Sequence, residues 1–150
     1  MTYDSTQDTV EHINKVAGHL VTIGIELMQR AMTHDASKLQ PPEKEVFDRM
    51  TPILRGLTYG SKEYKAALAE MDEALAHHYA HNAHHPEHYT AGIAGMTLMD
   101  LVEMFADWKA ASERHADGDF TRSLEINRER FGISDQLASI FENTRRSLGW

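Results

Sequence analysis

Apolar residues recur at helical spacing along most of the chain. Near the N-terminus they fall at steps of three and four: Val10, Ile13, Val16, Ala17, Leu20, Ile23, Leu27 and Ala31. This spacing predicts one helix from a cap at Asp4 or Ser5 to about Met32, with Gly18 and Gly24 as its weak points. No segment alternates apolar and polar residues long enough to predict a strand. The pattern therefore predicts a helical protein.

Further helices follow with recognisable starts. Pro41 and Pro42 suit the first turn of a second helix, and Ser61 suits the cap of a third helix that reads to about Asn82. Three later helices are predicted by GMTLMDLVEMFADWKAASERH, FTRSLEINRERFGIS and SDQLASIFENTRRSLGW. We therefore expect an all-α fold in which residues 1–150 form a single compact domain of five to seven helices. The last helix would close the core or contribute to a homodimer.

Composition narrows the range of functions. The chain has 150 residues, a formal net charge of −8 and no cysteine, so a metal would be held by His, Asp, Glu or Asn. No basic run is present, so duplex nucleic acid is not an expected partner. We do not expect the acidic, polar N-terminus to be a secretory signal, and the longest apolar run, HLVTIGIELM, is about half the length of a membrane span. We expect a cytoplasmic protein with no membrane partner.

Histidines are concentrated in one short stretch. Six of the ten fall within ALAHHYAHNAHHPEHY, residues 74–89. A stripe of apolar residues at helical spacing leads into this stretch and becomes polar without changing face: Tyr64, Leu68, Met71, Leu75, His78, Asn82 and His85. His78 is therefore the histidine expected to point inward. The alternative is that it is an ordinary core histidine with hydrogen-bond partners.

The other histidines of the stretch are less well defined by this spacing. His81 lies next to the inward face and is the second choice, whereas His77 lies on a flank and is expected to be solvated. His84, His85 and His88 sit where a proline ends the helix, so their directions cannot be predicted.

Two further motifs carry groups suited to metal or phosphate chemistry. In HDASK, His34 and Asp35 can share a metal ion or bind neighbouring ions, and Lys38 can meet a phosphate oxygen. The alternative is a polar stop at the end of a helix.

The second motif is MDLVEMFADW. Asp100, Glu103 and Asp107 are spaced by three and four residues, so their carboxylates share one helix face. Three like charges on one face repel one another unless a cation or basic groups intervene. The alternative is a solvated acidic stripe.

Taken together, the three motifs form a set of nitrogen and oxygen ligands. Such a set suits Mn²⁺, Fe²⁺, Zn²⁺, Co²⁺ or Mg²⁺, which the sequence does not distinguish. One or two ions could activate water and clamp a phosphate ester.

The chain resembles the HD superfamily of metal-dependent phosphohydrolases, and especially small HD-like proteins of phages and bacteria. The resemblance covers about residues 10 to 110 and is carried by HDASK, HHYAHNAHHPEHY and LVEMFADW. It implies an HD-like helical domain in which His34 and Asp35 are the paired ligands. It also implies a late aspartate, Asp107 in preference to Asp100.

The resemblance further implies that the intervening ligands are His78 and one of His84 or His85, of which His85 is preferred. The first histidine of the family pattern matches His12, only 22 residues before His34. One straight helix would place them about 33 Å apart at ~1.5 Å per residue, so we do not expect His12 to be a ligand. Glu43 is a further candidate carboxylate.

These observations lead to three hypotheses about function. The preferred one is a hydrolase of nucleotides or other small phosphoesters, with metal at His34, Asp35, His78, His85 and Asp107. In it, Lys38 neutralises phosphate charge and Glu103 orients or deprotonates the water. The second is an HD-type di-iron oxygenase with the same ligand types. The third is a non-enzymatic phage or bacterial binding protein whose histidines are structural.

Overall fold

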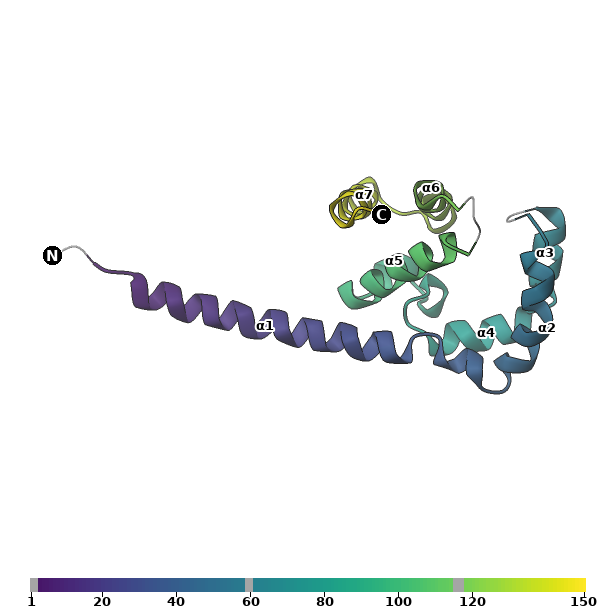
Figure 1. The fold of residues 1–150 in the computed structure, drawn as a ribbon, viewed down its shortest axis with the longest axis horizontal. Helices are drawn as coiled ribbons and strands as arrows, with labels where there is room; N and C mark the ends of the chain where they lie inside the picture. Colours follow the sequence, from purple (N-terminus) through teal and green to yellow (C-terminus); the bar gives the residue numbers. More distant parts are fainter. Residues whose placement is uncertain (1–2, 59–60, 115–117) are drawn as a thin grey trace. The chain divides into compact units, whose positions relative to one another are not determined.

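The computed structural model describes residues 3–58, 61–114 and 118–150. Within these ranges the chain contains seven α-helices, three short 3₁₀ helices and no strand (Figure 1). The predicted all-α fold is therefore confirmed. The chain divides into two units, Met1–His34 and Asp35–Trp150. The first contains a single helix, and the second contains all the others.

Helix α1, Thr6–Thr33, makes up the first unit. The Asp4 carboxylate accepts hydrogen bonds from the backbone N–H and the hydroxyl of Thr6, at 3.0 and 2.6 Å. It thereby provides an acceptor for one of the N–H groups that have no hydrogen-bond partner within the first turn of a helix. The helix is continuous through Gly18 and Gly24, and its bounds agree closely with the prediction.

The second unit begins with helices α2 (Glu43–Arg55), α3 (Lys62–Ala69) and α4 (Asp72–His81). The single helix predicted from Ser61 to about Asn82 is wrong in one respect, because it is interrupted between α3 and α4. There the backbone N–H groups of Glu70 and Met71 bond to the carbonyls three residues earlier, which tightens the turn. Ser61 caps α3 as expected, with its hydroxyl accepting from the N–H of Tyr64 at 3.1 Å.

The predicted inward stripe survives this interruption. Met71 and His78, two members of that stripe, are each 1% exposed, so His78 is buried as expected, whereas Leu75 between them is half-buried. Met71 packs with Met50 and Ala67 in an apolar cluster formed by α2, α3 and the start of α4.

A second apolar cluster holds α5 (Leu98–Ser112), α6 (Phe120–Phe131) and α7 (Asp135–Leu148) together. Its buried members are Met104, Phe105, Trp108, Phe120, Ile133 and Phe141. Each helix has a side-chain cap: Thr97 for α5, Asp119 for α6 and Ser134 for α7. Helix α7 closes this cluster through Phe141.

Three short 3₁₀ helices complete the second unit: η1 (Ala36–Leu39), η2 (Pro86–His88) and η3 (Gly92–Gly95). Both η1 and η2 pack against α4, and η1 also packs against α2. The residues next to η1 and η2 are thereby brought to α4. In the described part of the chain, no helix combines the length and the apolar character that crossing a bilayer would need.

Candidate metal centre

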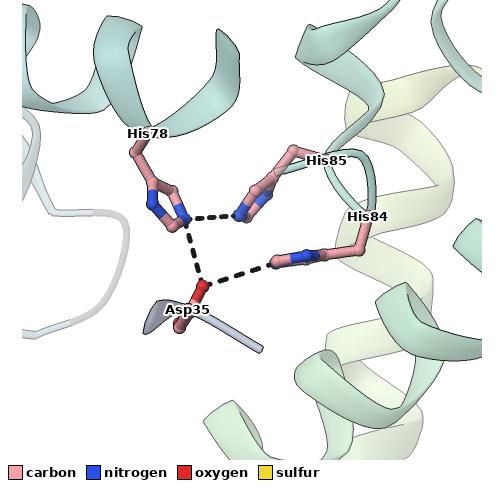
Figure 2. A group of neighbouring side chains, drawn as sticks. All are labelled: Asp35, His78, His84 and His85. Atoms are coloured by element: carbon pink, nitrogen blue, oxygen red, sulfur yellow. Dashed lines mark hydrogen bonds and ion pairs between the residues drawn. The ribbon is translucent and has the colours of Figure 1, made fainter. Parts of the chain in front are cut away.

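Four side chains from three segments of the second unit converge (Figure 2). Asp35 comes from the turn before η1, His78 from α4, and His84 and His85 from the loop between α4 and η2. His78 Nε2 lies 2.9 Å from His85 Nε2 and 3.2 Å from Asp35 Oδ1, and His84 Nε2 lies 3.5 Å from the same oxygen. One ligand atom from each residue falls within 4.8 Å of all the others. The cluster can therefore hold a metal ion.

The backbone brings Asp35 into the cluster through a left-handed turn. Its φ is 56°, a conformation that aspartate tolerates better than most residues. Asp35 is the N-cap residue of η1, and its carbonyl accepts the backbone N–H of Lys38 at 2.9 Å. Among the described residues other than glycine, Asp35 alone has a positive φ, and it is a candidate ligand.

The loop after α4 positions the two other histidines. Asn82 leaves the helix in an extended conformation, and its side-chain amide donates to the carbonyl of His78 at 2.8 Å, which satisfies a carbonyl of the last turn. Pro86 then begins η2. This short connection places the rings of His84 and His85 at 6.2 and 4.8 Å from the ring of His78, between centroids.

Two carboxylates lie behind the two buried histidines. Glu43 Oε2 is 2.9 Å from Nδ1 of His78, and Glu103 Oε1 is 3.2 Å from Nδ1 of His84. In both rings Nε2 faces Asp35 Oδ1. A carboxylate on one ring nitrogen keeps the proton there and leaves the lone pair of the other nitrogen for a metal. Both histidines are therefore oriented as metal ligands are.

The second oxygen of Asp35 is bound by Lys38. The Lys38 ammonium donates to Asp35 Oδ2 at 2.6 Å, and it also lies 5.1 Å from the centroid of the Phe47 ring. This arrangement leaves Asp35 Oδ1 directed at the histidines. The Lys38 side chain is 25% exposed, so its charge remains accessible beside the cluster.

Electrostatics favour the neutral imidazole that metal binding requires. Burial, together with the neighbouring charges of His84 and His78, lowers the pKa of His85 to about 3, whereas Asp107 acts in the opposite direction. Burial alone would raise the pKa of Glu43. Hydrogen bonds from its neighbours and the charge of His78 outweigh burial, so the pKa of Glu43 lies below its usual value.

The two alternative late aspartates have different places. A carboxylate oxygen of Asp107 lies within 4.8 Å of one from Asp35. Asp100 instead caps α5: its Oδ2 accepts from the backbone N–H and the hydroxyl of Thr97, both at 2.7 Å, and from the Tyr89 hydroxyl at 2.8 Å. Asp107 therefore lies next to Asp35. Asp100 instead belongs to the capping box at the start of α5.

His12 and His34 both belong to the first unit. His12 lies on the continuous helix α1, and His34 is its C-cap residue. At ~1.5 Å per residue, their separation of 22 positions corresponds to about 33 Å. They cannot share a metal ion, as the sequence led us to expect. The four convergent residues described above all belong to the second unit.

Two other histidines differ from expectation. His77, expected to be solvated, is 33% exposed and donates from Nδ1 to Glu43 Oε1 at 2.8 Å. His81, the second choice for an inward histidine, is exposed, and its ring stacks on that of His77 at 4.0 Å. Its Nδ1 bonds to the carbonyl of His77.

Sequence reasoning named Glu43 only as a further candidate carboxylate and missed Ser37. Glu43 is 0% exposed, yet a glutamate after two prolines is the usual composition of a helix start. Ser37 lies 3.1 Å from Glu43 Oε2, and nothing in HDASK distinguishes it from a solvated serine. Their contacts with His77, His78 and Asn82 are made across more than thirty residues of sequence, so local spacing does not reveal them.

Fold and centre together define an all-helical protein with a buried histidine–carboxylate cluster able to hold a metal ion. The chain belongs to DUF5662, a family of unknown function, whose model matches residues 1–147. No curated protein and no solved structure matches the chain.

Proposed function

We propose that the protein is a metal-dependent phosphohydrolase acting on a nucleotide or another small phosphoester. One observation carries the proposal: two buried histidines present Nε2 to the same Asp35 oxygen, and each has a carboxylate at Nδ1. The resemblance of HDASK and EMFADW to the HD superfamily supports the reaction class.

The proposed ligands supply three nitrogens and one oxygen, from His78, His84, His85 and Asp35. This set suits Mn²⁺, Fe²⁺, Zn²⁺, Co²⁺ or Mg²⁺. The resemblance adds His34, which precedes Asp35 in the chain, and Asp107, so one or two ions remain part of the proposal. We propose both His84 and His85 as ligands, although the resemblance implied only one of them.

The proposed chemistry assigns a role to the charged residues around the ligands. A divalent ion would supply positive charge for a phosphate and lower the pKa of a bound water. Lys38 orients Asp35 through Oδ2 and adds a second positive charge for the substrate. Glu103 holds the Nδ1 proton of His84, so we assign it the orientation of a ligand in preference to deprotonation of water.

A hydrolysis screen tests this proposal. Purified protein would be supplied with Mn²⁺, Co²⁺ or Mg²⁺ and assayed for phosphate release from nucleoside monophosphates and triphosphates. We expect release by the wild type, a loss of about 100-fold or more in Asp35→Asn because a ligand charge is removed, and full activity in the exposed control His81→Gln.

Two results would contradict the hydrolase. Oxygen consumption by the iron-loaded protein, without phosphate release, would point to the di-iron oxygenase. A folded protein that binds none of these metals would point to a non-enzymatic binding protein.

A further inference from the structure

A buried carboxylate lies on the side of His78 that faces away from Asp35. Glu43, the first residue of α2, is 0% exposed. Its Oε1 accepts from His77 Nδ1 at 2.8 Å, and its Oε2 lies 2.9 Å from His78 Nδ1. His78 Nε2, on the opposite edge of the ring, faces Asp35. Glu43 is therefore placed to act on His78 and not to bind the same ion directly.

The protons around His78 Nδ1 can be assigned from the donors available. The Asn82 amide nitrogen has two protons, and it donates to the Ser37 hydroxyl and to the carbonyl of His78, each at 2.8 Å. The same nitrogen lies 3.0 Å from His78 Nδ1, but both of its protons are already used. Asn82 therefore leaves Nδ1 without a donated proton.

Ser37 is accounted for in the same way. Its hydroxyl has one proton and two lone pairs. It accepts from Asn82 and donates to Glu43 Oε2 at 3.1 Å, so it has no proton left for His78 Nδ1, which lies 3.2 Å away. The proton between His78 and Glu43 must then be the one carried by His78 Nδ1.

We propose that Glu43 is a positioning residue that fixes His78 as its Nδ1–H tautomer, with Ser37 and Asn82 completing the arrangement. The Nε2 lone pair of His78 then accepts from His85 Nε2 at 2.9 Å in the metal-free chain, beside Asp35 Oδ1 at 3.2 Å. The part of this inference that concerns metal affinity rests on the proposed function, whereas the tautomer does not.

The geometry makes this assignment difficult to change. Both Glu43 oxygens are engaged, one by His77 and the other by His78 and Ser37. The carboxylate cannot rotate away from His78 without losing bonds in a buried site, where unpaired polar groups are costly. Carboxylates in this position typically change metal affinity by about 10–100-fold when removed.

Nitrogen-15 NMR of the histidine rings in the metal-free, full-length protein tests the tautomer directly. At about pH 8, above the ordinary histidine pKa, we expect His78 to be protonated at Nδ1 and unprotonated at Nε2. A wild-type protein with the proton of His78 on Nε2 would overturn the proposal, whether or not the chain binds metal.

Glu43→Gln is the matched variant, with Glu45→Gln as its control, because Glu45 is exposed on the same helix. A glutamine amide can donate to Nδ1, so we expect a population of the Nε2–H tautomer at His78 in Glu43→Gln only. We also expect its affinity for Zn²⁺ to fall about 10–100-fold. Unchanged tautomer and affinity in Glu43→Gln would overturn the proposal.

Ser37→Ala provides a second route if Glu43→Gln does not fold. It frees one Asn82 proton to donate to His78 Nδ1, so the Nε2–H tautomer should gain population; no gain would count against the proposal. If the wild type has the Nδ1–H tautomer and binds no metal, the positioning role stands and the proposed function fails.

Discussion

At the scale of single residues, the centre depends on which atom of each side chain is turned inward. Asp35 presents Oδ1 to the histidines because Lys38 binds Oδ2. His78 and His84 present Nε2 because carboxylates lie at Nδ1. Each inward atom is selected by a contact on the opposite side of the same side chain, so these candidate ligands are already oriented as metal binding would require.

The low pKa of His85 predicts how the stability of the metal-free protein depends on pH. In the folded chain the pKa of His85 is about 3, against an ordinary value of 6.5. Between these values the unfolded chain takes up a proton that the folded chain does not. The free energy of unfolding should therefore fall as the pH falls from about 6.5 towards 3. His85→Asn should lose less stability over this range.

Urea unfolding of the metal-free proteins between about pH 7 and 4 measures this difference. The exposed His88 supplies the control, and His88→Asn should follow the wild type. Identical pH dependence in His85→Asn and the wild type would show that the pKa of His85 is not displaced in this way.

At the scale of the elements, the spacing of apolar residues predicted most of the helices well. It predicted the loop between α4 and η2 poorly. The stripe that leads to His78 predicted its burial, because helix phase carries through the stretch from Met71. The turn between α3 and α4 was missed, since Glu70 and its alanine neighbours favour a continuous helix. The directions of His84 and His85 have no periodic basis, because they lie in a loop whose path depends on tertiary contacts.

Helix α5 offers a prediction at this scale through its capping box. The Thr97 hydroxyl accepts from the N–H of Asp100 at 3.2 Å, and the Asp100 carboxylate accepts from the N–H of Thr97 at 2.7 Å. Thr97→Ala should lower the free energy of unfolding by about 1 kcal/mol, measured by urea denaturation. Thr90→Ala, at an exposed position, is the control. Equal stability of the two variants would contradict the role of the cap.

At the scale of the whole molecule, the candidate centre connects parts of the second unit that are distant in sequence. His78 is on α4, next to the apolar cluster of Met50, Ala67 and Met71. Glu103 is on α5, whose Met104 and Phe105 belong to the other apolar cluster. His84 bonds Glu103 and faces Asp35. The centre is therefore a point at which two separately packed groups of helices meet.

The central claim is that these side chains form a metal site, and elemental analysis of the purified full-length protein tests it most directly. We predict about one or two divalent ions per chain in the wild type and in His81→Gln. His84→Gln and Asp35→Asn should lose metal while remaining folded, because each lacks a ligand atom that converges on the centre. Folded wild-type protein without metal after incubation with Mn²⁺, Fe²⁺, Co²⁺ and Zn²⁺, or equal metal content in all four proteins, would contradict the claim.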